Sequence, residues 1–293
     1  MSEANNSSTN SKSYLLGAGF FSQVLLALAL LTVIFVLFIT FEYLYVLFLK
    51  IGTRNVQLLP YTVTAEDKQI IFRQDTTKYP DAKQLPFSDN ERSGVEFTYS
   101  FYLFVNPSTF KGDDVLHHVF HKGFTSQWPL MGPGVFIKGN ANTMRVIMNT
   151  YENPYTHIDI ENIPVRKWFH CAVICRKNGL EIYINGNLSK KLPFKGTLPY
   201  QNFQDLILFS QNNLTVSKTG AACLKDIDGD TLRFSGAFSG NLSNLVYLAY
   251  AASFTEIQTL MNFGVSKKTV TQSQDVPPYL TDTYWTSSYQ MQN

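Results

Sequence analysis

The stretch whose residue types most clearly suggest chemistry is an acidic run late in the chain, Asp226-Ile227-Asp228-Gly229-Asp230. Three carboxylates on one turn can gather the oxygen ligands that Ca²⁺ prefers. The run is not an EF-hand loop, because its glycine is misplaced and Ala237 stands where the closing glutamate would be. Asp226, Asp228 and Asp230 are therefore a candidate ligand-binding and Ca²⁺ loop, with an ordinary polar turn as the alternative.

A second cluster consists of three histidines, His117, His118 and His121. Imidazole is a good metal ligand. On a regular strand, however, His117 and His121 share one face while His118 points to the other. No cysteine or carboxylate within this run completes a tetrahedral set, so we expect surface or half-buried histidines and no metal.

The three cysteines do not suggest a disulfide scaffold, because their number is low and odd. Cys171 and Cys175 are four residues apart on a predicted strand, which separates them by roughly 13 Å, too far for a bridge. We expect both to be buried as small hydrophobic side chains. The formal net charge of +2 gives no strong attraction to nucleic acid.

One long apolar segment lies near the N-terminus. Residues 13–41 carry no charge, and the apolar run 20–41 would span roughly 33 Å as a helix, which matches the hydrocarbon core of a bilayer. A cleaved signal peptide would have a shorter apolar region behind a basic start. A buried core helix rarely lacks charge over such a length. We therefore predict a transmembrane helix with its flanks at residues 14–49.

The flanking charges indicate which side of the membrane the rest of the chain occupies. Lys12 alone precedes the apolar run, whereas Lys50 and Arg54 follow it. Since basic residues favour the cytosolic side, the main domain is expected in the cytosol. Glycosylation sequons at Asn187 and Asn213, with a third at Asn241, favour the opposite side.

The remainder of the chain has the pattern of an all-β protein. We interpret residues 1–13 as a disordered tail, 50–92 as a stalk, 93–264 as a β domain and 265–293 as an extended C-terminal tail. Strands are predicted at 95–105, 115–121, 134–138, 144–149, 157–160, 168–176, 180–184, 206–209 and 240–250. Asn185-Gly186 predicts a tight hairpin turn. Ser253 and Glu256 form a capping box that begins one short helix, with Gly264 as its stop.

Two motifs in the β domain resemble the laminin-G-like and concanavalin A-like lectin/glucanase superfamily. The recurring core of that superfamily is a Trp-x-His-Val-Ala strand followed by a strand that ends in Tyr-Val/Ile-Asn-Gly. The matching residues here are Trp168-Phe169-His170-Cys171-Ala172 and Tyr183-Ile184-Asn185-Gly186. The resemblance covers residues 94–264 and implies an antiparallel jelly-roll sandwich, with His170 as a packing residue.

A glucanase of this superfamily would carry a Glu-x-Asp-x-x-Glu strand whose two glutamates do the chemistry. The nearest stretch here is Asp159-Ile160-Glu161, and the first glutamate falls at His157. The pair is incomplete, so we expect Asp159 and Glu161 to form a solvated strand face. We therefore predict no enzymatic activity.

Three further stretches, at 134–137, 148–154 and 163–168, resemble laminin-G-like domains of large nucleocytoplasmic DNA viruses, some of which follow a transmembrane anchor. This resemblance implies a virion membrane protein that contacts capsid or other structural proteins. The leading hypothesis is thus a membrane-anchored, non-catalytic structural or protein-interaction module. The alternative is a Ca²⁺-dependent carbohydrate-binding attachment protein.

Overall fold

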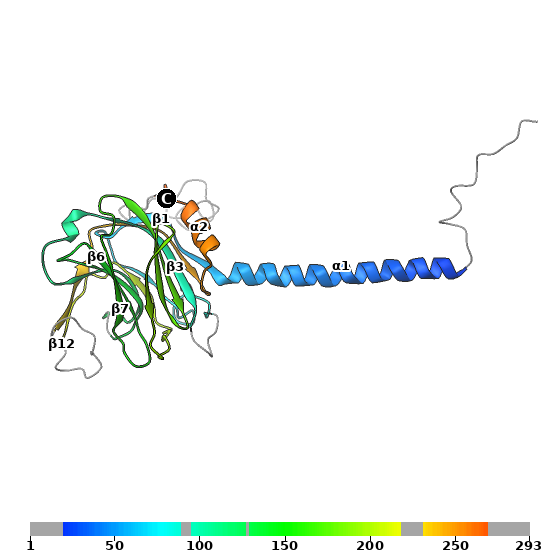
Figure 1. The fold of residues 1–293 in the computed structure, drawn as a ribbon, viewed down its shortest axis with the longest axis horizontal. Helices are drawn as coiled ribbons and strands as arrows, with labels where there is room; N and C mark the ends of the chain where they lie inside the picture. The colour runs from blue at the N-terminus through cyan, green and yellow to red at the C-terminus, as the bar shows by residue number, and fades with distance from the viewer. Residues whose placement is uncertain (1–19, 89–94, 127–128, 218–230, 269–293) are drawn as a thin grey trace, which may run out of the picture. The chain divides into compact units, whose positions relative to one another are not determined.

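The computed structural model describes residues 20–88, 95–126, 129–217 and 231–268. The chain divides into two compact units, residues 1–53 and residues 54–293. The first unit is built on the long helix α1 (Phe20–Arg54). The second contains a β-sandwich with one short α-helix and the 3₁₀ turn η1 (Pro107–Thr109) (Figure 1).

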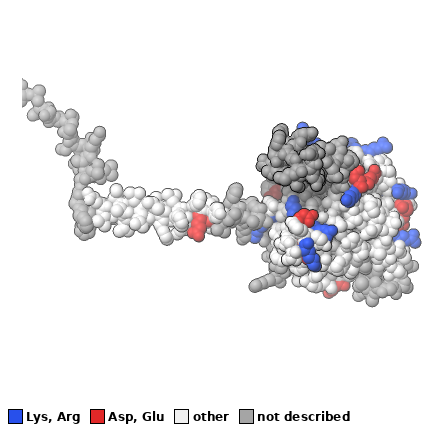
Figure 2. All heavy atoms as spheres, turned by 180° about the vertical axis from the view of Figure 1, so that it is seen from behind, with Lys and Arg blue, Asp and Glu red and all other residues white. Residues whose placement is uncertain are grey.

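Helix α1 is apolar along most of its length. Its segment Gln23–Tyr45 is long and hydrophobic enough to cross a membrane, and none of it is buried within the protein. A core helix would bury one face against its neighbours, so that alternative does not apply. Figure 2 shows the contrast, because charged side chains are scattered over the visible face of the sandwich but are nearly absent from α1. By length and composition the segment fits a membrane anchor or a signal sequence.

Two antiparallel sheets form the second unit. The six-stranded sheet has the order β1-β14-β3-β8-β9-β10. Its strands are β1 (Asn55–Thr64), β3 (Phe97–Val105), β8 (Trp168–Arg176), β9 (Gly179–Ile184), β10 (Asn187–Pro193) and β14 (Gly240–Leu248).

The eight-stranded sheet has the order β12-β13-β4-β5-β6-β7, and β11 lies between β4 and β2. Strand β13 runs parallel to its neighbour β4. The strands of this sheet are β2 (Ile70–Phe72), β4 (Leu116–Gly123), β5 (Met131–Lys138), β6 (Thr143–Met148), β7 (Thr156–Glu161), β11 (Leu206–Leu208), β12 (Asn213–Ser217) and β13 (Thr231–Ala237).

The core lies between the sheets and is rich in aromatic side chains. Alternate residues of β3 point inward, and the rings of Tyr99 and Phe101 both contact Phe120 of β4, at centroid distances of 5.6 and 5.1 Å. All three side chains are buried. Edge-to-face and tilted ring pairs of this kind stabilise a core beyond simple burial. The sandwich architecture expected from the sequence is confirmed.

The hairpin from β8 to β10 follows the sequence prediction closely. β8 pairs with β9 and β9 pairs with β10, both antiparallel. The turn between β9 and β10 places Asn185 at φ 48° and Gly186 at φ 76°. These positive angles are the ones that a two-residue type I′ turn requires.

The expected stalk is wrong, because residues 50–92 contribute strands to both sheets. β1 pairs with β14 and places Leu59 and Val63 in the core, while β2 pairs with β11. Pro60 is accommodated in β1 because β1 is an edge strand, where a missing backbone N–H is tolerated.

The short helix α2 (Phe254–Asn262) begins with the predicted capping box at Ser253 and Glu256. Its residues Ile257 and Leu260 pack on the outer face of the six-stranded sheet. After the helix, the Thr62 amide of β1 donates to the Lys268 carbonyl at 2.8 Å. The start of the predicted C-terminal tail therefore lies along the free edge of β1, and residues 269–293 lie outside the described residues.

The aromatic core provides a direct test of the sandwich. We expect Phe101→Ala to lower the free energy of unfolding by about 3–5 kcal/mol, because it opens a cavity where the sheets meet. Leu188→Ala on the exposed strand β10 is the control and should change stability by less than about 0.5 kcal/mol. Denaturant unfolding measures both, and equal effects would contradict the assigned core.

Candidate functional site

The three aspartates of the predicted Ca²⁺ loop, Asp226, Asp228 and Asp230, lie outside the described residues. Within the ranges that the structure describes, no group of three His, Cys, Asp or Glu side chains could hold a metal ion. The Ca²⁺ loop therefore stays a prediction.

The histidines of β4 are arranged differently from the prediction. The register of β4 against β5 shifts between His118 and Phe120. This bulge rotates the strand, so His118 and His121 lie together, with ring centroids 4.8 Å apart. His117 bonds separately to the Ser235 carbonyl. The expectation that His117 and His121 share a face was wrong because it assumed a regular strand. The expectation of surface or half-buried rings was wrong too, since all three are buried.

His118 and His121 belong to a chain of hydrogen bonds with one consistent direction. The Ser210 amide donates to Nδ1 of His118 at 2.9 Å, so Nε2 of that ring carries the hydrogen. Nε2 then donates to Nδ1 of His121 at 2.6 Å. Nε2 of His121 in turn donates to the Phe124 carbonyl at 2.6 Å. Every ring nitrogen is occupied in the neutral state, and neither ring can accept a proton without losing a bond.

Burial reinforces this neutrality. It lowers the pKa of His121 to about 4, although the Phe124 carbonyl partly opposes the shift. Burial, with repulsion from His121, holds the pKa of His118 well below its usual value. Both rings are therefore neutral at pH 7 and act as structural hydrogen-bonding groups.

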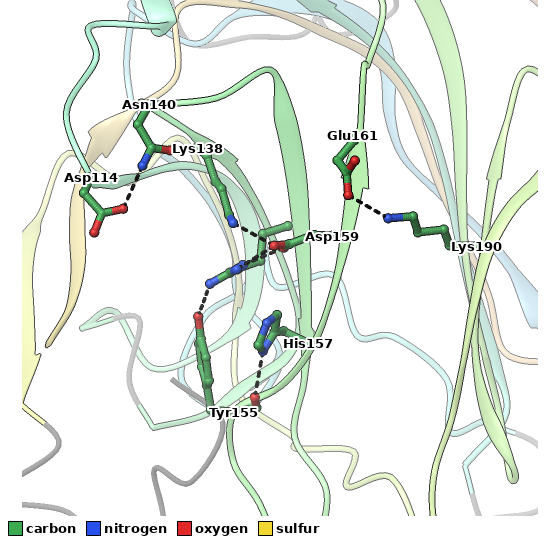
Figure 3. Close-up of polar contacts among 9 residues, drawn as sticks. Asp114, Lys138, Asn140, Tyr155, His157, Asp159, Glu161 and Lys190 are labelled. Carbon is green, nitrogen blue, oxygen red and sulfur yellow. Dashed lines mark hydrogen bonds and ion pairs between the residues drawn. The ribbon is translucent and has the colours of Figure 1, made fainter. Parts of the chain in front are cut away.

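The outer face of β6 and β7 carries a charged network (Figure 3). Arg145 makes a bidentate pair with Asp159, with two nitrogen–oxygen distances of 2.6 Å. Lys138 reaches the same carboxylate at 2.7 Å, and Arg145 also donates to the Tyr155 hydroxyl. Asp159 is thus not the solvated residue that we expected, because a buried arginine holds it in place.

This network excludes Asp159 from acid–base work. Burial would raise the pKa of Asp159, but hydrogen bonds from Arg145 and Lys138 outweigh it and bring the pKa to about 2. His157 and Glu161 lie on the same strand, and exposed Glu161 pairs with Lys190 at 3.1 Å (Figure 3). A retaining glycosidase needs two facing carboxyl groups with separated pKa values, which this strand does not provide.

A serine–histidine pair lies on the other sheet. The Ser100 hydroxyl is 2.8 Å from Nε2 of His170, and both residues are buried. Nδ1 of His170 has no hydrogen-bond partner, so no third group orients the ring as a general base. Burial lowers the pKa of His170 to about 4, which agrees with a packing role. Cys171 and Cys175 are buried free thiols, as predicted, and burial raises the pKa of both.

A groove at the rim of the sandwich is a candidate ligand site. Its volume is about 630 Å³, within the usual range for ligand sites. Phe87 and Phe203 stand at this groove with side chains 55% and 62% exposed, and their rings meet edge to face at 5.3 Å. Sequence reasoning missed the site, because the two rings are 116 residues apart in the chain and both lie in loops.

The groove also contains a buried cation. Lys122 of β4 is only 3% exposed, and its Nζ donates to the Gln204 carbonyl at 2.6 Å. Burial lowers the pKa of Lys122 to about 8, while Asp205 opposes the shift. The ammonium therefore remains charged at neutral pH and lines a groove beside two exposed aromatic rings.

The fold and these sites define a class of protein, a sandwich of the lectin type with no assembled catalytic group among its described residues. Residues 78–222 match a family model described as the concanavalin A-like lectin/glucanases superfamily. The sandwich therefore has the fold of this superfamily. Strands β1, β2, β13 and β14, which complete both sheets, lie outside the matched residues.

The chain is similar to the binding domain of botulinum neurotoxin serotype D, with a TM-score of 0.46, 10% identity, and coverage of 69% of this chain and 41% of that chain. It is also similar to the binding domain of botulinum neurotoxin DC in complex with rat synaptotagmin II, with a TM-score of 0.44, 14% identity, and coverage of 72% and 46%.

The chain thus spans less than half the length of these structures. A search of curated proteins found no match.

The Arg145–Asp159 pair yields a stability prediction. Asp159→Asn leaves a buried guanidinium without its carboxylate. We expect a loss of about 2–3 kcal/mol, below the ~3–5 kcal/mol of a completely buried pair, because the Asp159 side chain is 23% exposed. The folded pKa is depressed, so the wild-type contribution is present above the unfolded carboxyl pKa and is lost as pH falls toward 2.

Glu161→Gln is the matched control on the same strand. Its pair with Lys190 is exposed, so it should change stability by less than about 0.5 kcal/mol. Chemical denaturation at pH 7 and pH 3 compares the variants. An Asp159→Asn protein as stable as wild type at pH 7 would disprove the role of the pair.

The histidine chain predicts a second loss of stability in weak acid. The folded pKa values of His118 and His121 lie below the unfolded value, so the unfolded state takes up protons first. Stability is complete above about pH 6.5 and falls by about 1.4 kcal/mol per pH unit for each ring below it.

His121→Gln keeps one acceptor and one donor but cannot titrate, so its stability should fall less steeply between pH 6.5 and pH 4. Thermal unfolding across this range measures both slopes. Parallel slopes would show that His121 does not titrate on unfolding.

Proposed function

We propose that the chain is a single-pass membrane protein whose sandwich is a non-catalytic binding module at the membrane surface. One observation carries the proposal. The same chain contains an exposed apolar helix and a lectin-type sandwich, and the candidate catalytic side chains of that sandwich are not arranged for catalysis. Asp159 is bound by Arg145, and His170 lacks an orienting partner. Among the described residues, this leaves surface recognition as the function that the sandwich supports.

The partner that the sequence resemblance favours is another protein, a capsid or other structural component beside a virion membrane, with the sandwich on the cytosolic side. The positions of Lys50 and Arg54 after the apolar helix support this side. The small net charge of +2 argues against nucleic acid as the ligand.

Topology mapping of the full chain in microsomes tests the proposal. We expect the sandwich to be digested by added protease and to carry no glycan, while α1 resists alkaline extraction. N-terminal sequencing of the mature protein should still find α1, because an anchor is retained and a signal sequence is removed.

The structure also predicts which sequons would be glycosylated if the sandwich were lumenal. Asn187 and Asn213 are exposed at strand ends, whereas Asn241 lies within β14 between β1 and β3. A lumenal domain would therefore be glycosylated at the first two positions and not at Asn241. Glycans removed by Asn187→Gln and Asn213→Gln would overturn the cytosolic assignment.

A second candidate function is Ca²⁺-dependent carbohydrate binding, favoured by the family match and by the acidic run of Asp226, Asp228 and Asp230. Glycan binding by the full chain should then require Ca²⁺ and be lost in Asp228→Asn. Absence of binding with and without Ca²⁺ would remove this candidate.

A further inference from the structure

We infer that the rim groove binds a short segment of a protein partner, which places an apolar side chain against Phe87 and Phe203 and an acceptor oxygen on Lys122. The inference rests on the proposed function, because it identifies the surface and the ligand class of the binding module.

The aromatic pair supplies the apolar part of the site. Phe87 and Phe203 contact each other while more than half of each side chain is exposed. Leu85 and Pro86 line the same groove, so the rings extend an apolar surface instead of standing alone. Contiguous apolar surface that stays in water marks an interaction site more often than scattered hydrophobic residues do.

Lys122 supplies the polar part. An ammonium group has three hydrogen-bond donors, and the structure gives its Nζ one acceptor, the Gln204 carbonyl. Asp205 attracts the charge but is not within ion-pair distance. A buried cation is costly unless its donors are satisfied. A carbonyl or carboxylate oxygen from a ligand would satisfy the ammonium of Lys122.

Two carboxylates also line the groove, Asp75 and Asp205. Asp205 accepts from the Gln74 amide at 2.9 Å. Asp75 is exposed, but it already pairs with Lys78 at 3.2 Å. Hydrogen bonds from Thr77 and Lys78 lower the pKa of Asp75 to about 2. The acidic group at the mouth is thus compensated locally, and Lys122 remains the attractive charge for an incoming oxygen.

Five amide side chains line the groove, and three of them, other than Gln84 and Gln204, are held by hydrogen bonds within the protein. Asn202 donates to the Lys122 carbonyl and accepts from the Gln204 amide. Gln74 binds the carbonyls of Phe72 and Lys83 and accepts from the Leu85 amide. Gln201 accepts from Ser88 and donates to Tyr247.

These three side chains are therefore already engaged in holding the groove together. A saccharide needs many free directional groups for its hydroxyls, whereas an apolar side chain with one backbone oxygen needs few. The groove therefore fits a peptide better than a glycan.

The test uses the full chain in lipid nanodiscs and an array of 12-residue peptides. Each peptide carries one Phe, Trp or Leu at its centre, with or without a neighbouring Asp, in a Gly-Ser background. We expect binding to the aromatic and leucine peptides and not to the Gly-Ser parent. Phe87→Ala and Phe203→Ala should each weaken binding at least tenfold.

Phe263→Ala is the matched control, because Phe263 is 72% exposed and lies outside this groove. It should bind as wild type does. Lys122→Met tests the ammonium. Wild-type binding should fall from pH 7 to pH 9 as Lys122 loses its proton, and the variant should be weaker and independent of pH. Thermal unfolding of every variant confirms that the fold is kept.

Three outcomes would overturn the inference. Peptide binding that survives both phenylalanine variants would place the site elsewhere. Glycan binding, on a parallel glycan array, that is lost in Phe203→Ala would assign the groove to saccharides. No binding of any peptide at 1 mM would remove the groove as a peptide site. None of these results changes protease protection in microsomes, so membrane anchoring is judged separately.

Discussion

The aromatic contact between β3 and β4 is the interaction on which the rest of the sandwich depends. Phe120 of β4 touches both Tyr99 and Phe101 of β3, and Tyr99 also touches Tyr247 of β14. These central strands belong to different sheets, so the rings join the two layers at their middle. Because side chains alternate along a strand, fixing the inner face of each strand also decides which residues face outward.

The outer faces of the two sheets are covered by different kinds of contact. On the six-stranded sheet, α2 packs over the outward residues Ala172 and Ile174. On the eight-stranded sheet, two separate pairs satisfy their own hydrogen bonds. Arg145 binds Asp159, and the neutral rings of His118 and His121 bind each other. Buried polar groups that are completely paired make a face rigid and specific but leave little for a ligand. The proposed binding function is therefore assigned to the rim groove.

The sequence predicted local structure well where local chemistry decides it. The hairpin around Asn185 and Gly186 needs positive φ angles that these residues tolerate, and the capping box needs only Ser253 and Glu256. The fold class followed from such strands. The stalk was wrong because the partner of β1 is β14, almost 200 residues away, and no local pattern reveals such a pairing.

The candidate site was less predictable for the same reason. A single bulge after His118 changed which histidines meet, and bulges leave no clear trace in sequence. The environment of Asp159 depended on Arg145 from the neighbouring strand. The groove joins Phe87 to Phe203 through loop packing alone. Periodicity assigns residues to faces, but it does not show which polar groups remain unsatisfied.

The missing stalk changes what the binding module can reach. A stalk over residues 50–92 would have allowed the sandwich to move far from the bilayer. Instead β1 begins at Asn55, directly after α1. With α1 as the proposed anchor, nine residues separate Tyr45 at the end of the apolar segment from Asn55, a span of no more than about 35 Å when fully extended. If α1 is the anchor, the sandwich is thus tethered by a short segment, and the proposed partner would have to come within that reach of the membrane.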